Sequence, residues 1–269
     1  MAEEKRIGPT RVRITGQGTP LVLIHGVGLS LDHWDLMTPY LARDFQVIAY
    51  DAIGHGGSDK PAGPYEMPLF VHQLDELLRA LKIESCDIVG YSMGALIAEG
   101  FALKYPQKLR RLILLSGVYN RTPEERAVVL ERITQARKEG DAGFKAGIEK
   151  GLDRYFTPEF RAAHPEVVQE FVRRFQSNDL ECFLAAYYFF GTADADLVED
   201  VRKIACPTFV VTGENDQRST AAMSRSIAAQ MPNAKVEIIA GERHMPTLQM
   251  PEKLSRLFRD FLREEPFTA

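Results

Sequence analysis

The segment "VGYSMGAL" places a single serine, Ser92, between two glycines where a strand-like apolar run gives way to a helix-like run. Gly90 lies two residues before Ser92 and Gly94 two residues after it. A sharp turn from strand to helix would press these two positions together, and only glycine lacks the Cβ that would clash there. Such a turn would expose the hydroxyl and leave free amides at a helix start, where an anion can bind. The segment predicts a strand, a turn and a helix, although the pattern alone also fits a loop serine.

The rest of the chain alternates between strand-like and helix-like segments. Near-continuous apolar strands that alternate with helices are typical of an α/β fold with a mostly parallel sheet covered on both faces. The predicted strands are residues 20–26, 45–51, 86–92, 109–117, 207–213 and 234–241. The predicted helices are residues 70–81, 94–105, 221–230 and 251–263.

Residues 121–198 break this alternation, because they are helix-like throughout. A helical insertion between two parallel strands would lie beyond their carboxyl ends, where such sheets have their ligand crevice. We therefore expect residues 1–120 and 199–269 to form the core and residues 121–198 to form a helical lid. A helical excursion packed at the side of the sheet is the alternative.

Composition excludes several classes of partner. The 33 Lys and Arg residues nearly balance the 37 Asp and Glu residues, so neither nucleic acid nor an anionic membrane is expected as a partner. The charged start, "MAEEKRIGPT", lacks the apolar stretch of a secretory signal, and the three cysteines are scattered. No ligand cluster or phosphate loop is apparent. We expect a cytoplasmic protein with no metal and no organic cofactor, and the sequence leaves a homo-oligomer open.

Three residues at or just after the ends of predicted strands suggest nucleophilic catalysis. A serine hydroxyl needs a base, usually histidine, and the histidine needs a carboxylate that holds its tautomer. His244, in "AGERHMP", and Asp216, in "VVTGEND", both follow late strands. Because parallel strands end at one edge of the sheet, Ser92, Asp216 and His244 are expected to meet there. Candidate substitutes for the acid are Glu214, Asp194 and Asp196.

An oxyanion hole needs two N–H donors that face the developing negative charge. The residue after the serine, Met93, would supply one donor. The loop "HGVG" after an early strand would supply the other through Val27, since its glycines let the backbone approach a substrate.

The motifs "HGVG", "DAIGHGGSD", "GYSMG", "GEND" and "ERHMP", in this order, resemble the α/β-hydrolase superfamily. Within it the chain is similar to small lid-bearing members: 3-oxoadipate enol-lactonases and related esterases, cofactor-free perhydrolases, and meta-cleavage carbon–carbon hydrolases. The resemblance implies that Ser92 is the nucleophile, His244 the general base and then acid, and Asp216 the orienting carboxylate. Departures are the short loop "HGVGLS", Ala95 after the turn, and "QRST" after Asp216 in place of a proline-containing turn.

Five further residues are candidates for substrate binding: His25, Trp34, Tyr187, Tyr188 and Phe190. Of these, His25 is favoured as a brace for the oxyanion loop, and the aromatic residues are equally compatible with plain packing. The lid also contains cations that could meet a substrate carboxylate, namely Arg132, Lys145 and Arg173.

The resemblance implies a serine hydrolase that cleaves a small ester or lactone through an acyl-enzyme. Carbon–carbon bond hydrolysis and perhydrolysis on the same triad are alternatives. A ligand receptor that keeps the triad but turns over slowly is an alternative from another class. A non-catalytic scaffold conflicts with the complete set of catalytic positions.

Overall fold

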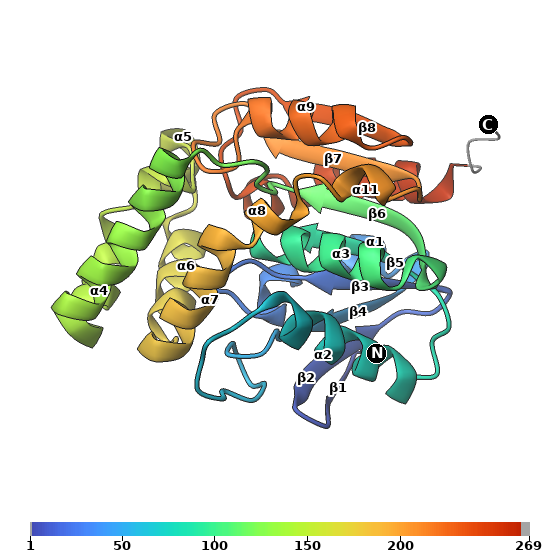
Figure 1. Cartoon of the computed structure of the whole chain (residues 1–269), viewed down its shortest axis with the longest axis horizontal. Helices are drawn as coiled ribbons and strands as arrows, with labels where there is room; N and C mark the ends of the chain where they lie inside the picture. The colour runs from blue at the N-terminus through green and yellow to red at the C-terminus, as the bar shows by residue number, and fades with distance from the viewer. Residues whose placement is uncertain (1, 265–269) are drawn as a thin grey trace.

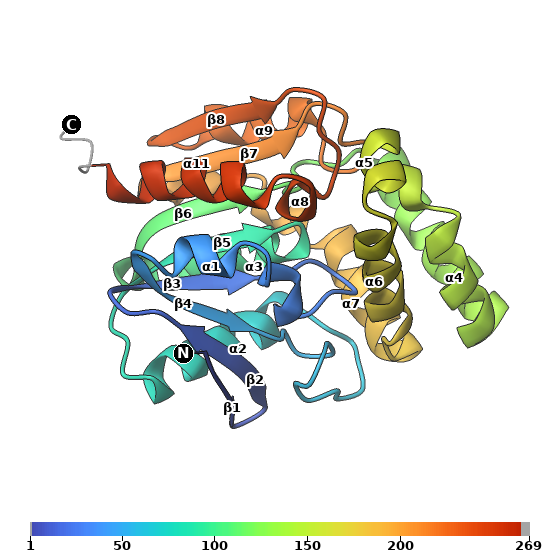
Figure 2. The same ribbon diagram turned by 180° about the vertical axis from the view of Figure 1, so that it is seen from behind.

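The computed structural model describes residues 2–264, which form one eight-stranded sheet with helices on both faces (Figures 1 and 2). Met1 and residues 265–269, part of the expected core range, lie outside the described residues. The strands are β1 (Glu3–Ile7), β2 (Thr10–Thr15), β3 (Thr19–Ile24), β4 (Phe45–Tyr50), β5 (Cys86–Tyr91), β6 (Leu109–Leu115), β7 (Thr208–Gly213) and β8 (Ala234–Ile239).

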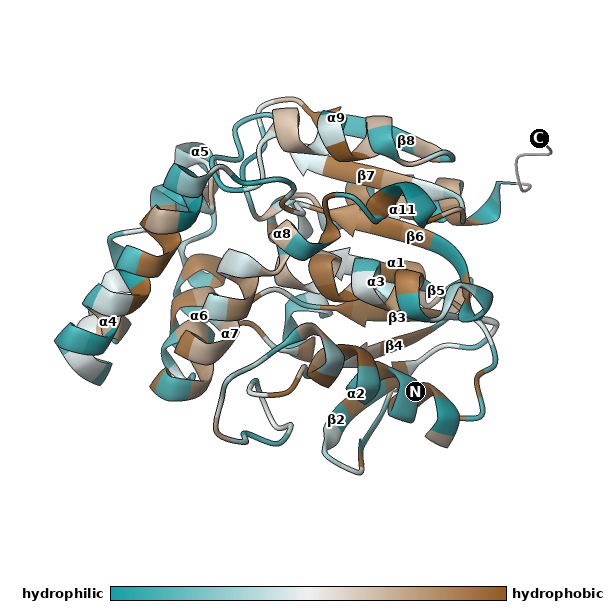
Figure 3. Ribbon diagram, viewed as in Figure 1, coloured by the Kyte–Doolittle hydropathy of each residue, from teal (hydrophilic) through white to brown (hydrophobic). Residues whose placement is uncertain are grey.

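The strand order is β1-β2-β4-β3-β5-β6-β7-β8, and β4, β3, β5, β6, β7 and β8 pair in parallel. The mostly parallel α/β sheet expected from the sequence is therefore confirmed. Figure 3 shows the central strands as largely hydrophobic, which fits strands buried on both faces. The hairpin of β1 and β2, which pairs antiparallel with β4, was not expected.

Helices cover both faces of the sheet. In Figure 1, α2, α3 and α9 lie in front of the sheet, and Figure 2 shows α1 and α11 on the opposite face. The core helices are α1 (Thr38–Leu41), α2 (Met67–Ala80), α3 (Met93–Lys104), α9 (Ala221–Gln230), α10 (Pro246–Gln249) and α11 (Pro251–Arg263), with short 3-10 helices η1 (Leu31–Trp34), η2 (Pro106–Lys108) and η4 (Val201–Lys203). Among the described residues, no helix combines the length and the hydropathy needed to cross a bilayer.

The chain between β6 and β7 is helical and lies at the carboxyl ends of the parallel strands (Figures 1 and 2). We call this segment, from α4 to α8, the helical cap. Gly140, with a φ of 68°, divides its first helix. The cap contains α4 (Pro123–Glu149), η3 (Leu152–Arg154), α5 (Pro158–Ala163), α6 (Pro165–Gln176), α7 (Leu180–Thr192) and α8 (Asp194–Leu197).

The turn between β5 and α3 has the geometry that its glycines suggest. A Cβ on Gly90 would lie 2.3 Å from the carbonyl oxygen of Gly94, so the two positions are in contact. A Cβ on Gly94 would in turn lie 2.3 Å from the carbonyl oxygen of Ile24, at the end of β3. Between them, Ser92 has a φ of 54°, which a residue with a side chain rarely adopts. Close packing on both sides thus holds Ser92 in a strained conformation.

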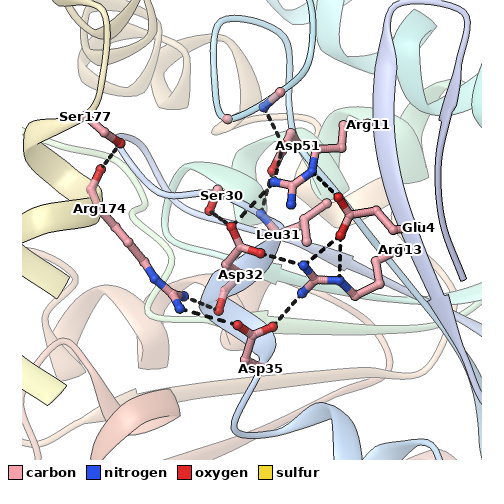
Figure 4. Close-up of polar contacts among 12 residues, drawn as sticks. Glu4, Arg11, Arg13, Ser30, Leu31, Asp32, Asp35, Asp51, Arg174 and Ser177 are labelled. Atoms are coloured by element: carbon pink, nitrogen blue, oxygen red, sulfur yellow. Dashed lines mark hydrogen bonds and ion pairs between the residues drawn. The ribbon is translucent and has the colours of Figure 1, made fainter. Parts of the chain in front are cut away.

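A network of charged side chains fastens the cap to the core (Figure 4). Arg174 of α6 donates from Nη1 to the carbonyl oxygen of Asp32, at 2.7 Å, and its Nη2 lies 3.5 Å from Asp35 Oδ2. Arg13 of β2 donates to the carboxylates of both aspartates. Buried Asp51 accepts from the Leu31 N–H at 2.6 Å, which fixes the start of η1. The loop after β3 is therefore held from the sheet and from the cap.

A second contact joins the cap to the loop after β3. Asn178 donates from Nδ2 to the carbonyl oxygen of Gly28 at 2.7 Å. A Cβ on Gly28, which has a φ of +73°, would lie 2.6 Å from the Phe175 ring. The backbone of this loop thus packs directly against cap side chains.

Replacement of Gly94 by alanine should destabilise the protein. The added Cβ meets the backbone oxygens of Ile24 and His25, which cannot rotate away, so we expect a loss of about 1–3 kcal/mol or more in the free energy of unfolding. Gly147→Ala in α4 is the control, since its Cβ meets nothing within 4 Å and should stabilise the helix by up to about 1 kcal/mol. Denaturant unfolding measures both, and equal stability of the two variants would contradict the packing described.

Arg174→Ala should loosen α6 without unfolding the core. Ion pairs this exposed typically contribute no more than about 1 kcal/mol, so the melting temperature should change little. Amide hydrogen exchange in α6 should become several-fold faster, because the bond to Asp32 is lost. Arg173→Ala is the matched control, since among residues 2–264 the Arg173 side chain bonds only to Glu170 of the same helix. Equal exchange in the two variants would contradict the role of Arg174.

Candidate active site

Three polar residues converge at the carboxyl edge of the sheet. Ser92 follows β5, Asp216 follows β7, and His244 follows β8. Each is only 3% exposed, although all three side chains carry polar groups. Burial of such groups is costly unless they are hydrogen-bonded, so their contacts indicate a built site.

Asp216 and His244 form the shortest contact of this group. His244 Nδ1 lies 2.6 Å from Asp216 Oδ2. The other carboxylate oxygen accepts from the N–H groups of Arg218, at 2.9 Å, and Ser219, at 3.0 Å. Burial raises the pKa of Asp216, but His244 and these N–H groups outweigh burial and hold the pKa below its usual value. An ionised Asp216 requires a proton on His244 Nδ1, which leaves Nε2 as the acceptor.

The loop that carries His244 is held by the strand that carries Ser92. Tyr91, the last residue of β5, donates its hydroxyl to the carbonyl oxygen of His244 at 2.7 Å. A Cβ on Gly213, the last residue of β7, would lie 2.4 Å from the carbonyl oxygen of Glu242, so this loop also packs on β7. Within residues 2–264, Ser92 Oγ makes no hydrogen bond to His244; such bonds are often long before a substrate binds.

The substitutes considered for the acid lie elsewhere. Glu214 is exposed and accepts from the Gly241 N–H. Asp194 is buried but pairs with Arg121, just before the cap, and with Arg126 of α4. Asp196 is exposed on α8. The geometry therefore pairs His244 with Asp216.

The two expected oxyanion donors, Val27 and Met93, lie beside Ser92. A Cβ on Gly26 would lie 3.1 Å from Ser92 Cβ, which places the loop containing Val27 against the serine. Met93 is the first residue of α3, where N–H groups have no acceptor within the helix. Across the described part of the chain, the N–H groups of Val27 and Met93 donate to no protein atom. Both are therefore available to an anion.

His25 is a brace, and the structure does not place it as a substrate contact. The residue is fully buried, its Nδ1 lies 2.8 Å from the Gly26 carbonyl oxygen, and its Nε2 accepts from the Ala52 N–H at 3.0 Å. Both ring nitrogens are thus used by the backbone. Burial lowers the pKa of His25 to about 4, so the ring is neutral near neutral pH.

Trp34 and Tyr188 are also not placed at a substrate cavity. Trp34 is fully buried and packs edge-on against His33 and Tyr91 in the core. Tyr188 is 50% exposed and lines a surface hollow together with Tyr65. Tyr187 and Phe190 lie three residues apart on another face of α7, and both line a cavity beside Arg218.

This cavity contains residues that were not singled out from the sequence. Arg154 of η3 and Arg218 line it together with Arg132, whereas the other two cap cations form ion pairs, Lys145 with Asp141 and Arg173 with Glu170. The sequence held one indication of this cavity. The segment "QRST" after Asp216 places Arg218 two residues beyond the carboxylate. Among the described residues, no group of three or more His, Cys, Asp or Glu side chains could hold a metal ion.

Known proteins resemble the chain over nearly its full length. Residues 19–251 match the family described as alpha/beta hydrolase fold. The chain is 32% identical over 252 residues to an (E)-2-((N-methylformamido)methylene)succinate hydrolase of Acinetobacter baylyi, over 93% of each protein. A 2-hydroxymuconate semialdehyde hydrolase of a Pseudomonas species is 27% identical, over 97% of this chain and 92% of that one.

The solved structure of an enol-lactonase from Burkholderia xenovorans superposes with a TM-score of 0.87 and 25% identity, over 97% of this chain and 100% of that one. The family match, the long alignments and the sheet topology agree. The chain therefore belongs to the α/β-hydrolase fold family and is an enzyme of that superfamily.

Proposed function

We propose that the protein is a serine hydrolase that cleaves a small ester or lactone through an acyl-enzyme at Ser92. The observation that carries this proposal is the 2.6 Å contact between His244 and buried Asp216, at the sheet edge where Ser92 lies on a strained turn. A buried carboxylate that orients a histidine beside a serine is the arrangement that activates a hydroxyl nucleophile.

In the first half of the reaction, Ser92 Oγ attacks the carbonyl carbon and His244 Nε2 takes the hydroxyl proton. The carbonyl oxygen becomes an oxyanion, which accepts hydrogen bonds from the N–H groups of Val27 and Met93. His244 then gives the proton to the leaving oxygen as the carbon–oxygen bond breaks. Loss of one oxyanion donor typically lowers the rate about 10²- to 10³-fold.

In the second half, His244 takes a proton from water, and the resulting hydroxide attacks the acyl carbon. The second oxyanion occupies the same hole and collapses as Ser92 Oγ leaves. His244 returns the proton to Ser92. Asp216 stabilises the imidazolium in both halves, which requires the low pKa that its hydrogen bonds provide.

The helical cap supports the choice of a small substrate, because it covers the carboxyl edge of the sheet (Figure 1). We propose that it acts as the lid expected from the sequence. The same proposal includes the remaining expectations from the sequence. These are a cytoplasmic location, a small-molecule partner without nucleic acid or membrane, and the possibility of a homo-oligomer.

The relatives favour two other bonds on the same triad. One is named as a hydrolase of a succinate with an N-methylformamido group, which favours a carbon–nitrogen bond. The other is named a 2-hydroxymuconate semialdehyde hydrolase, the type of relative behind the carbon–carbon alternative. Both reactions also use an activated serine or water at a carbonyl, so the triad alone does not distinguish them from ester cleavage. Analysis of the products formed from each substrate class does.

Ser92→Ala should abolish steady-state turnover of lactones and short p-nitrophenyl esters. Removal of the nucleophile from other triad hydrolases lowers kcat about 10⁶-fold, so the activity should fall to the uncatalysed background. Ser226→Ala, an exposed serine of α9, is the matched control and should turn over like the wild type. Near-normal activity of Ser92→Ala would contradict the proposal. One product per enzyme, in place of multiple turnover, would favour the receptor alternative.

A further inference from the structure

A cavity of about 210 Å³ lies between the cap and the loop that follows β7. Its lining is dominated by guanidinium groups and aromatic rings: Arg121, Arg132, Arg154, Arg218, Tyr187 and Phe190. The only carboxylate of the lining is that of Glu125, which is occupied at the start of α4, where it accepts from the Thr122 N–H at 2.9 Å. The cavity is therefore strongly cationic.

Three of these arginines have no anionic partner in the part of the chain that the structure describes. Arg121 pairs with Asp194 and donates to the Phe190 carbonyl oxygen. Within residues 2–264, by contrast, Arg132, Arg154 and Arg218 form no ion pair. The Nε atoms of Arg154 and Arg218 are buried and have no hydrogen-bond partner among the described residues. Unpaired buried charges are costly and are retained where a ligand completes them.

The electrostatics of the cavity show that these cations act together. Burial first, and then the proximity of Arg218, lower the pKa of Arg154. Burial raises the pKa of the Tyr187 hydroxyl, but Arg218 and Arg132 outweigh burial and lower it below its usual value. The guanidinium groups therefore lie close enough to repel one another, and an anion between them would relieve that repulsion.

The cavity adjoins the catalytic pair through Arg218. The Arg218 backbone N–H binds Asp216, and its guanidinium carbon lies 5.0 Å from the centre of the Tyr155 ring. That ring is centred 6.0 Å from the His244 ring. One aromatic ring therefore separates the cations from the catalytic base, a spacing that suits a small molecule with a reacting carbonyl at one end and an anion at the other.

The cavity on the other side of the cap has the opposite character. It lies between η1 and α6, and its charged lining contains four carboxylates and a single arginine: Asp32, Asp35, Glu166, Glu170 and Arg174. Arg13 binds Asp32 and Asp35. Arg174 binds Glu170, so among the described residues the cavity offers an anionic group no unpaired guanidinium. Of these two cavities, the one lined by Arg132, Arg154 and Arg218, which we call the arginine cavity, is therefore the one suited to negative charge.

We propose that the arginine cavity binds a carboxylate of the substrate, so that the enzyme acts on esters, lactones or amides of small dicarboxylic acids. This inference rests on the proposed function for the identity of the reacting group. Guanidinium groups bind carboxylates through paired, charge-assisted hydrogen bonds, which fits arginine rather than lysine at these positions.

Two esters matched in length test the specificity. Mono-p-nitrophenyl glutarate ends in a carboxylate, and p-nitrophenyl pentanoate ends in a methyl group at the same position. The ratio of kcat/KM for the first over the second should fall about 10- to 100-fold in Arg132→Gln, because a charge-assisted contact is lost. Arg218→Gln should lower it at least as much. Arg173→Gln, an exposed arginine paired within α6, is the control and should leave the ratio unchanged.

Binding of glutarate tests the site without turnover. Calorimetric titration of Ser92→Ala should detect binding of glutarate. The double variant Ser92→Ala, Arg132→Gln should bind glutarate about 10- to 100-fold more weakly. The Arg132 side chain is exposed, so its replacement should not affect folding. An unchanged ester ratio together with unchanged or absent glutarate binding would overturn the carboxylate site, even if turnover depends on Ser92. Turnover that survives Ser92→Ala would instead overturn the proposed function, whereas arginine-dependent glutarate binding would still support the site.

Discussion

Close packing of glycine backbones around the Ser92 turn is the constraint on which the site depends. Gly90 and Gly94 touch across the turn, and Gly94 also touches the end of β3. The contact forces the positive φ of Ser92, which presents the hydroxyl at the sheet edge and leaves the Met93 N–H free. The proposed nucleophile and one proposed oxyanion donor therefore arise from a single backbone feature.

The same strand end also positions His244, the proposed base. The Tyr91 hydroxyl donates to the His244 carbonyl oxygen, so the end of β5 positions both Ser92 and His244. His25, at the end of β3, binds the backbone of Gly26 and Ala52 and fixes the loop that carries Val27. Rigid strand ends thus support each group of the proposed mechanism, which is how preorganised sites reduce the cost of charge development.

Most of the core could be predicted from the sequence because buried parallel strands leave continuous apolar runs. Helices α9 and α11 have the predicted bounds. The β1–β2 hairpin was missed because its strands are charged: in β2, Arg11 and Arg13 alternate with Val12 and Ile14, a period-two pattern that apolar runs do not reveal.

The residues of the proposed triad could be chosen from the sequence because each lies where a strand ends, which is a local pattern. The cavity could not, because Arg132 comes from α4, Arg154 from η3 and Arg218 from the loop after β7. Their convergence depends on how the cap helices pack. The wrong grouping of Tyr188 with Tyr187 has the same cause. The sequence does not show how α7 is oriented, so adjacent aromatic residues could not be assigned to different faces of the helix.

Nucleophilic attack by Ser92 is tested most directly by mass spectrometry after treatment with a fluorophosphonate, which reacts covalently with activated serines. We predict one adduct per chain, on the peptide that contains Ser92, and much slower labelling in His244→Gln, because the base that removes the hydroxyl proton is absent. No adduct, or an adduct on another residue with Ser92 unmodified, would contradict the assignment of Ser92 as the nucleophile.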